Sequence, residues 1–241
     1  MDASYGARYA DLYRRHFWWR ARAEIIADLL RRRAPEGGFG SILDVGCGDG
    51  LSFDLLRAFG EPEGLEVDPA LVTDQGRAAG TIHVQPFDKT FQPANRYGLI
   101  TFFDVIEHLD DDIAALRHAR SLLVPGGQII ITVPALQTLW TRHDDYNHHR
   151  RRYTRKTLHA AASAAGLSVV TSRYIFHWLA VAKLVVKLRE SLTSPPSKAD
   201  LPSVPAAPVN NLMLSLCRLE RMTWGRLPWP FGSSLIAVVD S

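Results

Sequence analysis

The stretch Ile42-Leu43-Asp44-Val45-Gly46-Cys47-Gly48-Asp49-Gly50 joins a short apolar run to three closely spaced glycines. The apolar run predicts a strand, the glycines predict a tight turn, and the amphipathic segment 51–59 that follows predicts a helix. A glycine turn between a strand and a helix lets a ligand approach the backbone closely, because glycine has no Cβ and tolerates positive φ. This stretch therefore predicts a ligand-binding loop at the start of an α/β fold.

The rest of the chain continues the alternation of strand and helix that begins at this loop. Strands are expected at 64–68, 81–84, 99–103, 128–133, 167–172 and 234–239, and helices at 7–33, 111–123, 154–165, 175–192 and 210–223. Strands that alternate with helices at this spacing predict βαβ units and a mostly parallel sheet. The uninterrupted apolar character of 128–133 indicates a strand that is buried on both faces. The proline-rich stretch 194–208 predicts an extended loop.

Composition excludes several classes of protein. The chain has 241 residues, enough for one full α/β domain, and its 28 Lys and Arg against 25 Asp and Glu leave a net charge of +3. An excess this small argues for a nucleic-acid binder only if the charges cluster. Two cysteines exclude a disulfide scaffold and a CxxC zinc ribbon. The sequence shows no apolar run of membrane-spanning length and no signal-peptide pattern in residues 1–6, which together predict a cytoplasmic globular protein.

The acidic residues around the loop distinguish between two kinds of cofactor. A dinucleotide loop follows the spacing G-x-G-x-x-G, whereas here the glycines stand at 46, 48 and 50 and position 51 is leucine. Asp44 and Asp49 would repel a pyrophosphate at short range but attract a positively charged ligand. S-adenosylmethionine (SAM) carries a sulfonium and an ammonium and no phosphate, which suits these acids. Glu66, about 20 residues further on, can accept hydrogen bonds from ribose hydroxyls in either kind of site. A plain tight turn before a helix is the structural alternative.

Four segments resemble the motifs of class I SAM-dependent methyltransferases, in the order and spacing of that family. They are the stretch 42–50, Gly64-Leu65-Glu66-Val67-Asp68-Pro69, Phe102-Phe103-Asp104-Val105-Ile106-Glu107-His108-Leu109 and Leu122-Leu123-Val124-Pro125-Gly126-Gly127, and together they span residues 41–133. The pair Glu107-His108 is similar to the branch that holds ubiquinone-type and other small-molecule methyltransferases. Leu139-Trp140 through Tyr153, and the stretch from Pro230 to Leu235, resemble a bacterial group in that branch.

This resemblance implies an α/β fold with a Rossmann-like, seven-stranded sheet in the order 3-2-1-4-5-7-6, with the last strand antiparallel and helices on both faces. Residues 1–40 would form an N-terminal helical cap. Residues 41–174 and 234–241 would form the SAM-binding catalytic core, and 175–233 an inserted helical and proline-rich lid over the substrate.

The resemblance also implies a cofactor site, carried over residue by residue. The predicted cofactor contacts are Asp44, Gly46, Cys47, Gly48, Glu66, Val67, Phe87, Asp88, Phe103, Asp104 and His108. The loop residues would hold the methionine end, and Glu66 would hold the ribose. Phe87 would pack against the adenine and Asp88 would bind its amino group, while Asp104 would lie under the sulfonium. Cys47 receives no catalytic role, because a free cysteine is as readily a small hydrophobe. The product would be S-adenosylhomocysteine.

The most unusual stretch of the chain is the polar segment 140–153, which follows the strand predicted at 128–133. Ligands of open α/β sheets bind outside the carboxyl ends of the strands, so this segment is expected to lie over the transferred methyl group. Methyl transfer mainly requires alignment of the nucleophile with the C–S bond, and a hydroxyl nucleophile can also need a base, for which histidine is suited near neutral pH. We expect His143 or His149 to act as this base or to bind the substrate, with Asp144 orienting an imidazole.

Other interpretations of this segment stay open. The histidines and the run 150–153 would also suit a solvated structural loop that caps the next helix. Four residues could supply metal ligands, namely His143, Asp144, His148 and His149. The core motifs do not require a metal ion, however, and we predict none. His108, at the end of the fourth strand, is predicted to contact cofactor or substrate near the methyl group, with helix capping as the alternative.

The predicted substrate contacts are Trp19, Arg22, Trp140, Arg152 and Tyr153. The aromatic residues of the N-terminal helix would form a lid over the pocket, with Arg22 facing a carboxylate; packing of the same aromatic stripe on the core is the alternative. The helix 175–192 carries many apolar residues together with lysines and an arginine. This pattern favours an apolar or amphiphilic acceptor, or contact with a membrane surface. Ordinary packing of this helix against the sheet is the structural alternative.

The sequence thus predicts a SAM-dependent methyltransferase that acts on a small molecule, which can be apolar or lipid-like. The expected reaction is methylation of an oxygen atom. Methylation of nitrogen or carbon in a secondary metabolite stays open, as does a SAM-binding module without catalysis. Nucleic-acid methylation is a further alternative because of the clusters Arg14-Arg15, Arg31–Arg33 and Arg150–Arg152, although an Asn-Pro-Pro-Tyr type of motif is absent after the fourth strand. No nucleic-acid partner is expected. We expect a cytoplasmic monomer or homodimer, with or without peripheral contact to a membrane.

Overall fold

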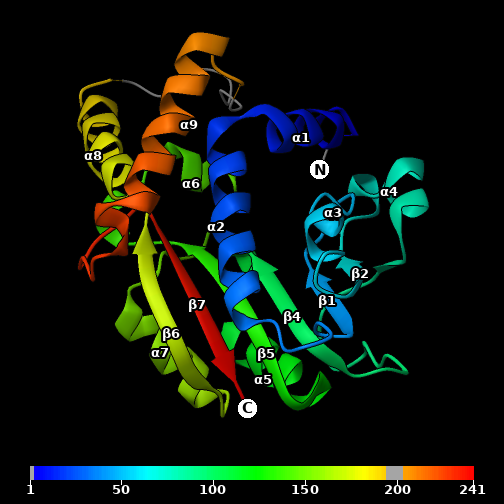
Figure 1. Cartoon of the computed structure of the whole chain (residues 1–241). Helices are drawn as coiled ribbons and strands as arrows, with labels where there is room; N and C mark the ends of the chain where they lie inside the picture. Colours follow the sequence, from blue (N-terminus) through cyan, green and yellow to red (C-terminus); the bar gives the residue numbers. More distant parts are fainter. Residues whose placement is uncertain (1–2, 194–202) are drawn as a thin grey trace.

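A seven-stranded sheet forms the centre of the computed structural model, which describes residues 3–193 and 203–241 (Figure 1). The strands are β1 (Ser41–Val45), β2 (Glu61–Glu66), β3 (Ile82–Val84), β4 (Tyr97–Phe103), β5 (Leu123–Pro134), β6 (Ser168–Ile175) and β7 (Ser234–Asp240). Their order is β3-β2-β1-β4-β5-β7-β6. The pairings among the first five strands are parallel, whereas β7 runs antiparallel to β5 and β6. The predicted strand order and the antiparallel last strand are confirmed.

Helices cover both faces of the sheet (Figure 1). They are α1 (Ala3–Arg15), α2 (Phe17–Arg33), α3 (Phe53–Leu56), α4 (Asp74–Ala79), α5 (Asp112–Leu122), α6 (Arg142–Tyr146), α7 (Arg155–Ala164), α8 (His177–Ser191) and α9 (Ala207–Met222), with the 3₁₀ helices η1 (Pro69–Leu71), η2 (Ile106–His108), η3 (Gln137–Leu139) and η4 (Trp224–Arg226). On one face, α2 and α9 bury side chains such as Leu30 and Leu214 in one apolar cluster. On the other face, α5 and α7 bury Leu116 and Leu158 in a second cluster. The sheet therefore lies between two apolar layers.

The central strands send apolar side chains to both faces, which explains their uninterrupted apolar sequence. In β5, Ile129 and Ile131 belong to the cluster of α5 and α7, and Ile130 belongs to the cluster of α2 and α9. Ile42 and Leu43 of β1 divide between the two clusters in the same way. Successive residues of a strand face opposite sides, so a strand that is covered on both sides needs apolar residues at every position. The prediction of a doubly buried fifth strand is confirmed.

Most of the motif segment 122–127 lies within β5. Leu123 pairs with Tyr97 of β4, and the next pair is Gln128 with Leu99, so the segment between Leu123 and Gln128 bulges out of the ladder. Gly126 lies in this bulge with a φ of 76°, a backbone conformation that glycine adopts without strain.

The prediction of one N-terminal helix is wrong, because the structure breaks it at His16 into α1 and α2. The backbone of His16 is extended, with a ψ of 135°. Asn210 of α9 satisfies the backbone on both sides of the break: its Oδ1 accepts a hydrogen bond from Phe17 N at 2.8 Å, and its Nδ2 donates to Arg15 O at 2.9 Å. A residue far along the chain therefore stabilises the break, which the local pattern does not reveal.

The helix predicted at 51–59 is also wrong in length, since α3 has only four residues. The hydroxyl of Ser52 donates a hydrogen bond to the carboxylate of Asp44, and the side chain of Phe53 is fully buried. These tertiary contacts determine the path of the chain around α3, in place of the longer helix that the sequence predicted. The polar connection predicted after β5 likewise contains the short helices η3 and α6.

The segment between β6 and β7 folds into α8, α9 and η4 in its described part. At the start of α8, the backbone N–H groups of His177 and Trp178 donate to the carboxylate of Glu220 at 3.0 and 3.1 Å, so that α9 caps α8. Most of the loop predicted at 194–208 lies outside the described residues, and the division into cap, core and lid stays a prediction. Among residues 3–193 and 203–241, no helix combines the length and the apolar character needed to cross a membrane.

Candidate functional site

The glycine loop after β1 is tightly packed at one residue and open at the next glycine. Gly46 and Gly48 have φ values of 70° and 54°, in the region that favours glycine. A Cβ on Gly46 would lie 2.6 Å from Cγ2 of Val105, and position 46 therefore has no room for a side chain. A Cβ on Gly48 would meet no atom of the described chain within 4 Å. A ligand can therefore approach the loop backbone at Gly48.

Asp44 lies buried at the end of β1, at the base of this loop. Its carboxylate accepts a hydrogen bond from Thr101 Oγ1 at 2.6 Å and another from the Ser52 hydroxyl. Burial raises the pKa of Asp44 to about 6, although the two hydroxyl donors and Arg22 oppose the shift. A cation bound nearby would favour the ionised form of this carboxyl group.

Glu66 supports the loop from the end of β2. One carboxylate oxygen accepts a hydrogen bond from Gly48 N at 3.0 Å, and the other accepts from Asp68 N at 2.9 Å. The side chain of Glu66 is buried, whereas the neighbouring Val67 is 62% exposed. The carboxylate is therefore fixed at the edge where the sequence predicts the ribose, with an exposed apolar side chain beside it.

Two other loop residues are engaged by the fold. Cys47 is buried, and a Cβ on Gly64 would lie 2.3 Å from its Sγ. This burial raises the pKa of the Cys47 thiol, which therefore carries little thiolate at neutral pH. Asp49 accepts hydrogen bonds from Thr73 N at 2.8 Å and Thr73 Oγ1 at 2.9 Å, next to the start of α4. The carboxylate of Asp49 is therefore tied to α4 rather than left for a ligand.

The two residues predicted to contact the adenine follow β3. Phe87 is half-buried, and its ring lies 5.5 Å from that of Phe102 between the ring centres. Asp88 is exposed and accepts hydrogen bonds from Thr90 Oγ1 at 2.6 Å and Thr90 N at 2.8 Å. These hydrogen bonds lower the pKa of Asp88, so that its carboxylate is ionised and able to accept from an amino group. Their contact with adenine stays a prediction.

A cavity of about 550 Å³ opens at the carboxyl ends of β4 and β5. Its walls are aromatic where α1 and α2 contribute, carry both apolar residues and the charged Lys183 and Glu190 along α8, and are polar at the end of β4 and in the loop after β5. The lining includes Tyr9, Phe17, Trp18 and Trp19, then Leu179, Ala182 and Val186, and at the polar end Asp104, Glu107, His108, His143 and His149. Apolar walls with a few convergent polar groups are typical of small-molecule sites. We call this space the acceptor cavity.

Asp104 follows β4 directly and lines the acceptor cavity, at the edge of the sheet where the sequence predicts the cofactor. Its φ of 58° is uncommon for a residue with a side chain, and such backbone conformations cluster at functional sites. Its carboxylate forms an ion pair with the buried Arg22 of α2, whose guanidinium lies 5.0 Å from the ring centre of Trp18 and 5.8 Å from that of Phe103. Arg22 is therefore engaged by Asp104 and does not line the cavity, whereas Trp19 does.

Asp144 organises the polar end of the cavity. Its fully buried carboxylate accepts hydrogen bonds from His149 Nδ1 at 2.8 Å, from Arg152 Nε at 2.8 Å and from Arg152 Nη2 at 3.0 Å. Burial alone would raise the pKa of Asp144, but the hydrogen bonds from His149 and Arg152 hold it well below its usual range. Asp144 thus orients His149. His143, exposed toward the cavity, contacts Asn147 instead, at 3.1 Å.

The other predicted substrate contacts serve the structure around the cavity. Arg152 lines the cavity, but its guanidinium is bound to Asp144 and to Ala135 O. Trp140 donates from Nε1 to an Asp145 carboxylate oxygen at 2.9 Å, and Tyr153 is buried with its hydroxyl on the carboxylate of Asp112. Neither Trp140 nor Tyr153 is among the residues that line the cavity.

Glu107 is a cavity residue to which the sequence assigned no role. It is fully buried, and neither carboxylate oxygen has a hydrogen-bond partner in the described part of the chain. This burial raises the pKa of Glu107 to about 8.

The rings of His108 and His149 lie 4.8 Å apart, and burial together with His149 lowers the pKa of His108 to about 4. Ligand atoms of Glu107, His108 and His149 lie within 4.8 Å of one another and could hold a metal, which is a different set from the one considered in the sequence.

Lys183 of α8 also lines the cavity, although the sequence pattern did not single it out as a site residue. Its ammonium makes no hydrogen bond or ion pair with the residues that the structure describes. Burial lowers the pKa of Lys183 to about 8, and the nearby Arg152 adds to the shift. Leu179, Lys183 and Val186 follow one another at helical spacing and share one face, so the helical period could have placed Lys183 at the cavity.

Residues 18–172 match the model of a family described as the methyltransferase domain. The chain belongs to this family. Its sheet order and motifs are those of class I SAM-dependent methyltransferases, and SAM is the cofactor of this class. The site fits that cofactor: the buried carboxylates of Asp44 and Glu66 suit a positively charged ligand without phosphate, and the open space at Gly48 admits it.

Curated relatives and solved structures agree with this assignment. Ubiquinone biosynthesis O-methyltransferases are similar, with 23% identity over 134 residues in Aromatoleum aromaticum (48% of this chain, 57% of that protein) and 27% over 106 residues in Vibrio vulnificus (40% and 45%). The chain spans about half the length of the curated relatives it matches. A putative methyltransferase of Haloferax volcanii, solved with the Trm112 methyltransferase activator, has a TM-score of 0.62 and 19% identity, with 98% and 94% of the two chains covered. A SAM-dependent methyltransferase of Archaeoglobus fulgidus has a TM-score of 0.56 and 16% identity, with 91% and 94% covered. These structures show a shared fold.

We expect the affinity for SAM to fall as the pH is lowered from 7 to 5. The pKa of Asp44 is about 6, so the carboxylate that attracts the cationic ligand is mostly present at pH 7 and is lost as the pH falls through that value. One pH unit below the pKa, about a tenth of the carboxyl groups is ionised, which predicts an affinity about tenfold weaker. Calorimetric titration with SAM at pH 5, 6 and 7 measures this.

Asp44→Asn should bind SAM weakly at every pH and lose most of the pH dependence. Asp49→Asn is the matched control in the same loop, because Asp49 is bound to Thr73, and it should keep the wild-type profile. A wild-type pH profile in Asp44→Asn would show that this carboxylate does not control cofactor binding.

Proposed function

We propose that the chain transfers the methyl group of SAM to a hydroxyl oxygen of a small molecule bound in the acceptor cavity. The observation that carries this proposal is a histidine in the cavity lining, His149, that is oriented by a buried carboxylate, Asp144. The name of the similar ubiquinone biosynthesis O-methyltransferases supports an oxygen acceptor.

Asp144 selects the tautomer of His149. Because the pKa of Asp144 lies well below its usual range, the carboxylate is ionised at neutral pH and can only accept hydrogen bonds. His149 Nδ1 must therefore carry the proton in the 2.8 Å contact, which leaves Nε2 as the acceptor for the proton of a hydroxyl group. The same carboxylate would stabilise the imidazolium that forms.

Most of the remaining task is alignment. Bound SAM supplies an electrophilic methyl group, and the chain has to hold an acceptor oxygen in line with the C–S bond. The aromatic wall of Phe17, Trp18 and Trp19 would hold an apolar acceptor and exclude water from it. Asp104 and Arg22 fix α2, which carries this wall, against the end of β4.

The other two cavity histidines are weaker candidates for the base. Burial lowers the pKa of His108 to about 4, and desolvation together with Lys183 does the same for His143. A general base works best when its pKa lies near the working pH, so both would accept a proton poorly at pH 7. They are more suitable as neutral hydrogen-bonding partners of the acceptor.

Lys183 indicates the kind of acceptor. A half-buried ammonium without a partner, in a cavity of mostly apolar walls, suits a molecule that joins an apolar or aromatic body to an anionic group. We therefore propose an amphiphilic acid with a hydroxyl group as the acceptor. Methylation of nitrogen or carbon would need the same alignment but not the same base, so loss of His149 distinguishes these reactions.

Replacement of His149 by alanine should lower kcat by about 10²-fold or more, the usual contribution of a positioned base. The assay is release of S-adenosylhomocysteine with a panel of alkyl-substituted hydroxybenzoates, which carry the hydroxyl, the apolar body and the anionic group proposed above. Asp144→Asn should also lower kcat, since the tautomer of His149 is then no longer fixed.

His143→Ala is the matched control, because His143 lines the same cavity but contacts Asn147 rather than Asp144. It should change kcat by less than about threefold, a small effect beside that of a base. Full turnover of His149→Ala at subsaturating acceptor would rule out the base role.

Lys183→Met should raise KM for hydroxybenzoates about tenfold, with a smaller effect on kcat, since a hydrogen bond to a charged group contributes about 1.5 kcal/mol. For wild type, KM should be lowest near pH 7 and rise as the pH climbs through the Lys183 pKa of about 8, where the ammonium loses its proton. Lys187→Met, on the exposed side of α8, is the control and should leave KM unchanged. Equal KM values for the acid and its methyl ester would refute an anionic acceptor.

We also propose that α8 contacts a membrane surface. Leu184, Val185 and Leu188 are at least half exposed, at 50, 64 and 63%, which supports it. Wild type should then float with liposomes in a density gradient, whereas Leu184→Gln/Leu188→Gln should not. Wild-type protein that stays at the bottom of the gradient would remove the proposal.

A further inference from the structure

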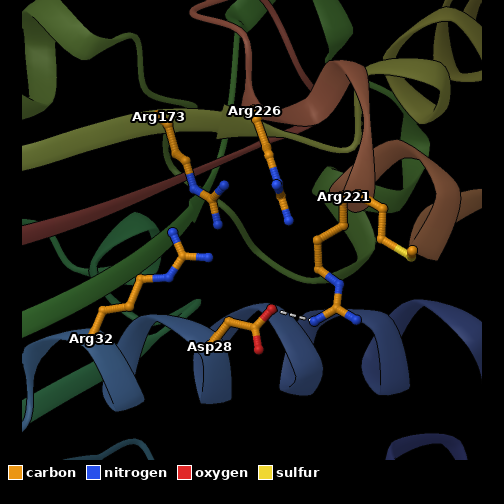
Figure 2. A pocket seen from close by; sticks show the side chains of 6 residues that line it. Asp28, Arg32, Arg173, Arg221 and Arg226 are labelled. Carbon is orange, nitrogen blue, oxygen red and sulfur yellow. Dashed lines mark hydrogen bonds and ion pairs between the residues drawn. The ribbon is translucent and has the colours of Figure 1, made fainter.

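A second concave site lies on the face of the sheet that carries α2 and α9, and it shares no lining residue with the acceptor cavity. We call it the arginine pocket; its lining is Asp28, Arg32, Arg173, Arg221, Met222 and Arg226. Its volume is about 190 Å³. The four arginines come from four elements: Arg32 from α2, Arg173 from β6, Arg221 from α9 and Arg226 from η4. Figure 2 shows their guanidinium groups converging on the space between α2 and β6.

Acidic side chains neutralise only part of this positive charge. Asp28 accepts a hydrogen bond from Arg31 with one oxygen, at 2.5 Å, and forms an ion pair with Arg221 through the other. Arg221 also pairs with Glu24 at 3.3 Å, yet its Nε is buried and has no partner in the described chain. Both carboxylate oxygens of Asp28 are thus occupied by Arg31 and Arg221, and neither is bonded to the other arginines of the pocket.

The remaining three arginines are not bonded to any acidic side chain in the described residues. Within residues 3–193 and 203–241, the side chains of Arg32, Arg173 and Arg226 make no hydrogen bond or ion pair. Arg173 is half-buried, and burial followed by the nearby Arg32 lowers its pKa, as expected for a cation that is desolvated beside like charges. Like charges held together in this way destabilise the fold unless an anion compensates them.

The chemistry of these side chains selects the anion. Each guanidinium presents a planar fork of N–H donors that matches two oxygens of a phosphate or carboxylate. Three unpartnered forks from separate elements suit a tetrahedral group with three acceptor oxygens and two negative charges better than a carboxylate with two oxygens and one charge. We propose that the arginine pocket binds a phosphoryl group, either as a free phosphate compound or as the head group of a phospholipid.

Binding would have a mechanical consequence. One phosphoryl group between Arg32, Arg173 and Arg226 would link α2 and β6 to η4, which follows α9 directly. A ligand that binds the folded state alone raises its stability in proportion to RT ln(1 + [L]/Kd). Phosphate should therefore raise the unfolding temperature, and above the Kd the rise should follow the logarithm of the phosphate concentration. This inference is independent of the proposed methyl transfer.

The test compares the 241-residue chain with Arg32→Gln/Arg226→Gln, two substitutions at exposed positions. Thermal unfolding and calorimetry are followed against inorganic phosphate at constant ionic strength set with chloride. Wild type should show saturable binding by calorimetry and a rise in unfolding temperature with phosphate, and the double variant should bind phosphate at least about tenfold more weakly. Without phosphate, the double variant should unfold at a higher temperature, because two repelling charges are gone. Arg14→Gln/Arg77→Gln, with the same change in charge at exposed sites elsewhere, should respond to phosphate as wild type does.

A second arm separates the two sources of the phosphoryl group, using liposomes with and without phosphatidic acid. A saturable response to inorganic phosphate identifies a soluble phosphate compound. Flotation that requires phosphatidic acid and is lost in Arg32→Gln/Arg226→Gln, without a response to free phosphate, identifies a lipid head group. If wild type and Arg32→Gln/Arg226→Gln respond alike in both arms, the pocket does not bind phosphoryl groups and the inference is overturned.

Discussion

The buried carboxylate of Asp144 organises the loop on which the proposed chemistry depends. Its partners come from both sides along the chain: Thr141 N precedes it at 2.9 Å, and His149 and Arg152 follow it. A buried charge is tolerated only when hydrogen bonds and opposite charge compensate its desolvation. Here the compensating contacts close the loop on itself and, through Arg152 and Ala135 O, fix it to the end of β5. The orientation of His149 and the stability of the loop therefore have the same physical cause.

The helix α2 reaches from the end of β4 to the arginine pocket. Its Arg22 pairs with Asp104 at the end of β4, where the unusual backbone of Asp104 places the carboxylate at the border of the acceptor cavity. One turn earlier, Trp18 and Trp19 form part of the cavity wall, and near the other end Arg32 reaches the arginine pocket. A single helix thus contacts the end of β4, the acceptor cavity and the anion site proposed above, whereas the sequence predicted only its aromatic lid and the pairing of Arg22 with a carboxylate.

Features with a local signature were predictable from the sequence, and features made by distant residues were not. The open loop at Gly48 follows from glycine spacing, because φ depends on the residue itself and its neighbours. The break of the N-terminal helix at His16 depends on Asn210, which lies far away along the chain. Lys183 is an intermediate case, since the helical period places it on the cavity face but does not show what that face covers. Convergence of the four arginines around Arg173 depends on the tertiary fold alone.

The net charge of +3 conceals a separation of charge that the fold produces. Carboxyl groups gather at the carboxyl edge of the sheet, where burial raises the pKa of Asp44 to about 6 and that of Glu107 to about 8. Arginines gather on the face of α2 and α9, where burial lowers the pKa of Arg173. Each grouping costs stability through desolvation and repulsion, and both costs fall when a ligand of opposite charge binds. The acids suit the sulfonium and ammonium of SAM, and by the same physical reasoning the arginines suit an anion.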